Sequence, residues 1–434
     1  MSQATLPTTG VSGPIDEAYL TGASSPLMKP DNIYLPAGAG AGAARGLLGL
    51  GLFGFVVLLV AAFAGFARHA LAAYHVAIMT CLAISLGAMF LVMTWHLFAA
   101  GWSVSLRRQA ENLMRSAPIF GALALVTPLV DYLFLGGKLF TWMNPKFAQE
   151  YVLLHKAPWL NAPFFFFRGV IYVVVWAFIS NAMWTYSRTQ DQTGDRWLTN
   201  KARKTSTFGM VLFALSTAFA AFDWLMSVDY KMFSTMWGVA YFAAAIFSAI
   251  ATLILVIAIL QGKGLLKGVV THEHYHDAGK LLFSFTVFWA YINFSQYFLI
   301  WYSNIPEETR YYLYRQQSGW EILFYVLCIG HFFVPFLFLI FRGVKRSRGL
   351  LMVAAVWGLF VHVVDIAYII RPMVYAGVPA DQVGSPALWI LDIIAIVAGL
   401  AVFSGLLIPR ISSGPLVPLR DPRMHECLAH KNYV

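Results

Sequence analysis

Charged residues are scarce in this sequence. Only 12% of its 434 residues are Asp, Glu, Lys or Arg, about half the share of a typical soluble globular protein. Cysteine is scarcer still, because Cys81, Cys328 and Cys427 are the three in the chain and they lie far apart. They form neither a CxxC pair nor a cluster motif, which excludes an iron–sulfur cluster held by this chain alone.

Apolar residues make up 59% of the chain and fall into separate blocks of roughly 20–27 residues. A helix of that length crosses about 30 Å of hydrocarbon. The pattern predicts an all-α polytopic membrane protein with about ten transmembrane helices. Their expected ranges are 47–67, 74–101, 117–136, 163–187, 205–226, 235–260, 280–303, 318–341, 350–371 and 387–408.

The segments outside these blocks give the expected orientation. The even-numbered connections hold most of the lysines and arginines, as in the run from Arg342 to Arg348, and cytoplasmic loops carry this excess. Residues 1–45 lack the charged start and apolar core of a signal peptide. We therefore expect 1–45 and 411–434 to be cytoplasmic tails of a multi-pass protein of a bacterial inner membrane. The net charge of +10 is spread over the loops, so no nucleic-acid partner is expected.

The order of the blocks indicates an internal division of the transmembrane domain, 46–410. Setting aside flanking helices at 47–67 and 387–408, two sets of four helices remain, at 74–226 and 235–371. Each set ends with an acidic residue near its outer face, Asp223 in the first and Asp365 in the second. We expect two four-helix bundles related by an internal repeat.

Several ionisable or polar side chains lie inside the predicted helices. Such a group costs about 2.5–3.5 kcal/mol at the centre of a membrane helix, so it normally faces a bundle interior and marks function. Helical spacing puts His362 on one face with Asp365 and Tyr368, and Glu321 on one face with Tyr325, Cys328 and His331. We expect a proton path built from Asp131, Asp223, Asp365, His96, His331, His362, Tyr368 and Glu321. The alternative is that the acids form structural ion pairs with Arg168 or Arg371.

Two further kinds of site can be read from polar residues and histidines. Asp223 together with Asn293, Gln296 and Tyr297 predicts a quinone-binding face in which the carboxylate accepts the quinol proton. His75 and His96 stand about 20 residues apart on one helix, a haem-like spacing, but the matching pair on a second helix is missing. The histidines of the THEHYHDAG segment, His272, His274 and His276, alternate as in a metal-binding strand, although a solvated loop is the commoner explanation.

Two longer segments carry a family resemblance. They are FDWLMSVDYKMFSTMWGVAYF at 222–242 and FWAYINFSQYFLIWYSNIPEET at 288–309. The chain resembles the membrane subunits of bacterial alternative complex III, which are similar to the polysulfide-reductase (NrfD-like) family. The resemblance extends over the number, order and length of the helices. The modest length of the whole chain is similar to that of the shorter of the two related subunits.

The resemblance implies an NrfD-like fold of two four-helix bundles with flanking helices. It also implies a place in a complex that oxidises menaquinol and passes electrons to a periplasmic acceptor. Haem c and iron–sulfur clusters would then reside in partner subunits: an iron–sulfur subunit, multihaem cytochromes c and a larger NrfD-like membrane subunit, in some cases with a terminal oxidase. This chain would hold no cofactor except menaquinone or menaquinol, and would conduct protons, bind quinol or do both among membrane lipids. An independent secondary transporter remains the alternative from a different class.

Overall fold

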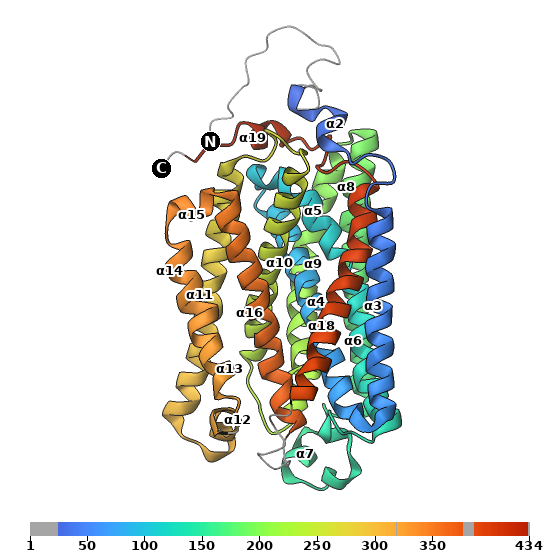
Figure 1. The fold of residues 1–434 in the computed structure, drawn as a ribbon, viewed down its shortest axis with the longest axis vertical. Helices are drawn as coiled ribbons and strands as arrows, with labels where there is room; N and C mark the ends of the chain where they lie inside the picture. The colour runs from blue at the N-terminus through green and yellow to red at the C-terminus, as the bar shows by residue number, and fades with distance from the viewer. Residues whose placement is uncertain (1–24, 318, 376–385, 433–434) are drawn as a thin grey trace.

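The computed structural model describes residues 25–317, 319–375 and 386–432. Long helices stand side by side along one common axis, with shorter helices at both ends (Figure 1). Within the described residues, eight helical stretches are long and apolar enough to cross a membrane. These stretches confirm an all-α, multi-pass membrane protein.

The longest stretch, Ala41–Leu97, contains two helices, α3 (Ala41–Ala61) and α4 (Ala67–Leu97). The chain turns between them at Gly65, whose φ of 100° is readily adopted only by glycine. A further long helix, α11 (His272–Ser303), is too polar along its length to be counted among the eight. The expected number of about ten membrane crossings stays a prediction.

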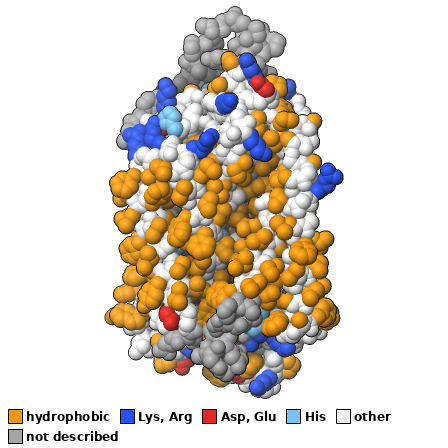
Figure 2. Space-filling view, viewed as in Figure 1, with side chains coloured by type: hydrophobic (Ala, Val, Ile, Leu, Met, Phe, Trp, Pro, Cys, Tyr) orange, Lys and Arg blue, Asp and Glu red, His pale blue; other side chains and the backbone are white. Residues whose placement is uncertain are grey.

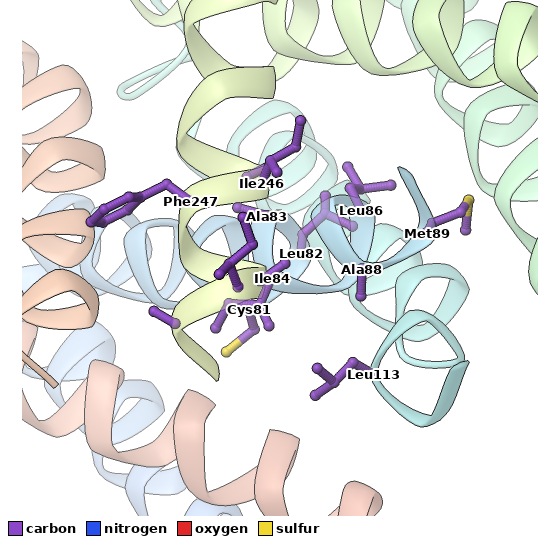
Figure 3. Close-up of a cluster of buried hydrophobic side chains, with 14 of the residues drawn as sticks. Cys81, Leu82, Ala83, Ile84, Leu86, Ala88, Met89, Leu113, Ile246 and Phe247 are labelled. Atoms are coloured by element: carbon purple, nitrogen blue, oxygen red, sulfur yellow. The ribbon is translucent and has the colours of Figure 1, made fainter. Parts of the chain in front are cut away.

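Helix α4 lies at the centre of the molecule and is buried along almost its whole length. Its small and aliphatic side chains pack against α10 (Trp237–Gly262), and Figure 3 shows Leu82, Ala83 and Leu86 of α4 beside Ile246 of α10. Gly87 permits this close approach, since a Cβ there would lie 2.0 Å from the backbone oxygen of Ala245. A close-packed α4–α10 contact therefore joins the two halves of the chain.

The remaining long helices pack in two groups around this pair. Helices α6 (Ala117–Val130), α8 (Ala162–Thr193) and α9 (Trp197–Trp224) lie with α4. Helices α11, α16 (Arg348–Val374) and the broken helix α13–η8–α14 (Glu321–Tyr325, Val326–Phe333, Val334–Leu339) lie with α10. Helix α18 (Pro386–Ser412) packs on α3 and α4 at the side (Figure 1).

One end of the molecule, which we call the tail side, carries both described chain ends (Figure 1). Asn32 hydrogen-bonds the 266–267 backbone there, and the carboxyl-terminal segment 414–432 folds over α5 (Val104–Met114) and the start of α11. The opposite end, the α12 side, carries α7 (Tyr151–Lys156) and α12 (Pro306–Gln317). The described parts of both tails are thus folded onto the bundle.

The histidines of the THEHYHDAG segment do not lie in a loop, because α11 begins at His272 and not near residue 280. Thr271 caps this helix: its Oγ1 accepts from the Glu273 backbone N–H, and its own N–H donates to Nδ1 of His274 at 3.1 Å. His274 is buried against Cys427 and His430 of the carboxyl-terminal segment, and His276 is also buried, so the expectation of a solvated loop is wrong for these two residues.

The outer surface matches a lipid environment. Figure 2 shows hydrophobic side chains over the middle of the visible face, with lysines and arginines gathered toward its two ends. Phe63 in η2 (Ala62–Phe66) is 86% exposed and Phe208 on α9 is 76% exposed, which suits lipid contact and not water. The inner-membrane location and the cytoplasmic side of the tails remain predictions.

Candidate functional site

The acid of the first bundle, Asp223 near the end of α9, lies in a closed polar cluster. Arg168 on α8 donates to both carboxylate oxygens, from Nε at 3.0 Å and from a terminal nitrogen at 2.8 Å. The Tyr172 hydroxyl donates at 2.8 Å and the Trp159 indole N–H at 2.9 Å. The Arg168 guanidinium also stacks on Trp159 at 3.9 Å. Every lone pair of this buried carboxylate is therefore committed, as in a structural ion pair.

Other polar groups of the first bundle are similarly committed. Asp131 accepts backbone N–H groups from Lys138, Leu139 and Phe140, which fixes the loop after η4 (Asp131–Leu135). His75 uses both ring nitrogens, on the Thr127 hydroxyl at 3.0 Å and the backbone oxygen of Trp224 at 2.7 Å. A histidine held in this way has no nitrogen free for a haem iron.

The acid of the second bundle, Asp365 on α16, is held differently. Its Oδ2 accepts the indole N–H of Trp289 at 3.0 Å, and no Lys or Arg among the described residues lies within 4.0 Å. The same indole stacks on the His331 ring, with centroids 3.7 Å apart and planes 8° apart. Trp289 thus positions a carboxylate and an imidazole together, while the carboxylate has no counter-ion.

His331 and His362 are both completely buried, and their ring nitrogens make no hydrogen bond to another described side chain; the His362 ring faces the backbone of Thr80. His331 lies in η8, a π-helical stretch of the kind often found at functional sites. His362, Asp365 and Tyr368 share the buried side of α16, as their spacing predicts. The hydroxyl of Tyr368 is also buried without a partner.

A cavity of about 650 Å³ opens beside Asp365. This volume lies within the range of small-molecule sites, about 300–1,000 Å³. Its wall is mainly aromatic, and three exposed side chains from α11 and η8, Tyr291 (62%), Phe294 (65%) and Phe333 (53%), stand at its edge. The cavity therefore opens toward the lipid-facing surface. The polar groups of its wall come from Asp365, Trp289, Asn293, Gln296, Tyr297, Tyr311, Tyr312, Cys328 and Tyr368.

The predicted face of Asn293, Gln296 and Tyr297 lines this cavity, but Asp223 does not. Gln296 accepts from the Ser234 hydroxyl at 3.2 Å, which joins the 222–242 and 288–309 segments. Asp223 stays in the first bundle with Arg168, so the structure does not bring it to the other three residues. The acid that shares their cavity is Asp365.

Sequence reasoning missed the cover on the α12 side. Helix α12 brings Tyr311 and Tyr312 into the cavity wall, and the Tyr312 hydroxyl accepts from Gln296 at 3.4 Å. Arg315 behind them is fully buried, donates to the backbone oxygens of Tyr368 and Ile369, and stacks over Tyr311 at 3.5 Å. The polar sequence YYLYRQQ at 311–317 is typical of an external loop. Its arginine, Arg315, was the one signal that this segment could pack on the bundle.

The remaining predicted residues lie apart from the cavity. His96 is in the last turn of α4, near the tail-side pair Arg107–Asp421. Glu321 begins α13 and does not line the cavity, and Tyr325 is 59% exposed, so the expected face with Cys328 and His331 is interrupted where η8 begins. Arg371 pairs with Asp392 at 3.0 Å, which is the structural alternative foreseen for such acids.

In comparisons with known proteins, no protein-family model and no curated protein matches the chain. Among the described residues, no group of three or more His, Cys, Asp and Glu lies close enough to hold a metal ion.

Proposed function

We propose that this chain is an integral membrane subunit of a respiratory quinol-oxidising complex of the alternative complex III type, and that its second bundle takes up protons at Asp365. One observation carries the proposal. Asp223 and Asp365 end their helix sets in similar places. Asp223 is neutralised by Arg168, whereas Asp365 has no counter-ion in the part of the chain that the structure describes and forms part of a cavity wall. A carboxylate left unpaired in hydrocarbon is costly, and such residues generally serve proton or ion movement.

The neighbours of Asp365 suit a short proton relay. His362 lies one helical turn away on α16, and His331 stacks on the tryptophan that donates to Asp365. Imidazole titrates in the physiological range and can pass a proton from one nitrogen to the other. Because no described side chain hydrogen-bonds the nitrogens of either ring, water molecules could link the two histidines.

A second candidate function is direct binding of menaquinol in the same cavity. Its aromatic wall fits a fused ring system, its lipid-facing edge suits entry of an isoprenoid-tailed molecule, and Tyr368 and Asp365 offer hydrogen-bonding groups to a hydroxylated ring. Asp365 would act as the general base for the quinol proton. Electrons would leave through iron–sulfur and haem groups of partner subunits.

The independent transporter is the competing class. A transporter substrate site usually lies at unwound or proline-broken helices. The broken helix α13–η8–α14, with Pro335, fits that description in part. Purification separates the classes, because a respiratory subunit is expected to purify with redox partners and a transporter alone.

The testing experiment isolates the assembly through a tag on this chain and identifies its partners by mass spectrometry. Quinol-dependent electron transfer and proton release are then compared for wild type, Asp365→Asn and the exposed control Glu307→Gln on the α12 side. We expect haem and iron–sulfur subunits to co-purify, and Asp365→Asn to lose proton release while the control retains it. Loss of electron transfer as well would favour quinol binding in the cavity. Purification of the chain by itself would contradict the proposal.

A further inference from the structure

Three arginines gather on the tail side, away from the cavity, with no acid among them. They are Arg115 just before α6, Arg188 near the end of α8 and Arg410 near the end of α18. Each is half-buried, and none has a carboxylate within 4.0 Å among the described residues. Three helices from distant parts of the sequence thus bring like charges to one place.

Contacts through Trp184 and two serines hold the group together. Arg188 stacks on the Trp184 ring at 4.5 Å, and Arg115 lies 5.8 Å from the same ring centre. Arg410 donates to the Ser116 hydroxyl at 2.6 Å. Arg188 donates to the hydroxyl of Ser413, three residues after Arg410, at 2.8 Å. Arg115 and Arg410 are close enough for their charges to repel each other.

The acids nearest to this group are already bound elsewhere. Asp191 pairs with Arg108 and accepts the backbone N–H of Leu419, and Glu111 lies between Arg107 and Arg108 at 3.4 Å from each. Asp191 and Glu111 act on Arg188 only from beyond ion-pair distance, so among the described residues none of the three arginines has a direct ion pair. Like charges held together in a partly desolvated place repel one another unless an anion joins them.

The position of the three arginines relative to the membrane indicates what kind of anion they bind. The arginines lie where three long helices meet the tail side, at the expected boundary between hydrocarbon and headgroups, and the first turn of α6 adds the positive end of a helix dipole. Toward the bilayer centre, Ile119 on α6 (38% exposed) and Phe178 on α8 (61% exposed) present apolar surface. Guanidinium groups bind phosphate oxygens through paired hydrogen bonds, and basic pockets between membrane helices bind anionic headgroups.

We propose that Arg115, Arg188 and Arg410 form a binding site for the phosphate of an anionic phospholipid, whose acyl chains lie along α6 and α8. The Arg115 guanidinium makes no hydrogen bond to a described residue and is the donor left for the phosphate. Arg188 and Arg410 keep their serine contacts and supply further N–H groups. The site is independent of the Asp365 cavity and of the respiratory proposal.

The test uses the full chain in mild detergent, with phosphatidylglycerol as the probe and native mass spectrometry as the readout. The variants are Arg115→Gln and Arg188→Gln, and Lys201→Gln, an exposed residue on the same side, is the matched control. We expect each arginine variant to weaken lipid binding about tenfold, as for the loss of one charge-assisted contact of about 1.4 kcal/mol, and Lys201→Gln to leave it unchanged. Circular dichroism verifies that the variants are folded.

Two further arms distinguish a lipid from a free anion. Diacylglycerol with the same chains lacks the phosphate and should not compete, and inorganic phosphate at equal concentration should not displace the bound lipid. Unchanged phosphatidylglycerol binding in folded Arg115→Gln and Arg188→Gln would overturn the site. Displacement by inorganic phosphate, or equal binding of diacylglycerol, would overturn its assignment to a phospholipid.

Discussion

The two acids of the two bundles are expected to respond in opposite ways to the same substitution. Asp223→Asn leaves the Arg168 guanidinium buried beside a neutral amide, and breaking a buried pair in this way typically costs about 3–5 kcal/mol of unfolding free energy. The structure supports the upper part of that range, because Arg168 makes two bonds to this carboxylate and is itself only 5% exposed. Asp365→Asn leaves no buried cation unpaired and keeps an oxygen that accepts the Trp289 N–H. We therefore expect it to lower the unfolding free energy by under about 1 kcal/mol.

The assay is unfolding of the purified chain in mild detergent, followed by the same probe for all variants. A double variant, Arg168→Gln with Asp223→Asn, removes both charges and should be less destabilised than the sum of the two single variants, which measures the coupling. Equal stability of Asp223→Asn and Asp365→Asn would refute the distinction between a paired and an unpaired acid. Greater damage from Asp365→Asn would refute it more strongly.

Three further predictions concern other parts of the molecule. Gly87→Ala should destabilise the protein by about 1–3 kcal/mol in thermal unfolding, since the new Cβ would press on the backbone of Ala245. Gly65→Ala should cost about 1–2 kcal/mol, measured in the same way, because a side chain disfavours the φ of 100° between α3 and α4. Burial alone would raise the pKa of Asp421, but the charge and hydrogen bond of Arg107 outweigh it and hold that pKa below its ordinary value of 3.8. The contact therefore stabilises the carboxyl-terminal segment above that value and is lost as the pH falls through the lowered pKa, so amide exchange of 414–432 should accelerate in acid in wild type and much less in Asp421→Asn.

The membrane architecture could be predicted from the sequence because twenty-residue apolar blocks have few alternative structures in a bilayer. The helix face of His362, Asp365 and Tyr368 could also be predicted, since α16 is regular across these positions. The face from Glu321 to His331 could not, because η8 changes the helical repeat between Tyr325 and His331. The spacing of residues in the sequence predicts which of them share a helix face only where the helix has no π-helical segment.

The partners of the acids were harder to predict. Asp223 and Asp365 look alike in sequence, as each lies near the outer end of a predicted helix. What separates them is Arg168, 55 residues away from Asp223, and the indole of Trp289, 76 residues away from Asp365. Such pairings depend on how helices pack, which apolar periodicity does not specify. The cover by α12 was missed for a related reason, since a polar segment that packs on a cavity has the composition of a loop.

The most direct test of the central claim, that Asp365 is the proton-accepting group of this chain, is infrared difference spectroscopy of the isolated assembly during quinol oxidation. Protonation of a buried carboxylate produces a carbonyl band of the neutral acid. The account predicts such a band in wild type and in Glu307→Gln, and its loss in folded, assembled Asp365→Asn. An unchanged band in Asp365→Asn would show that another group takes the proton.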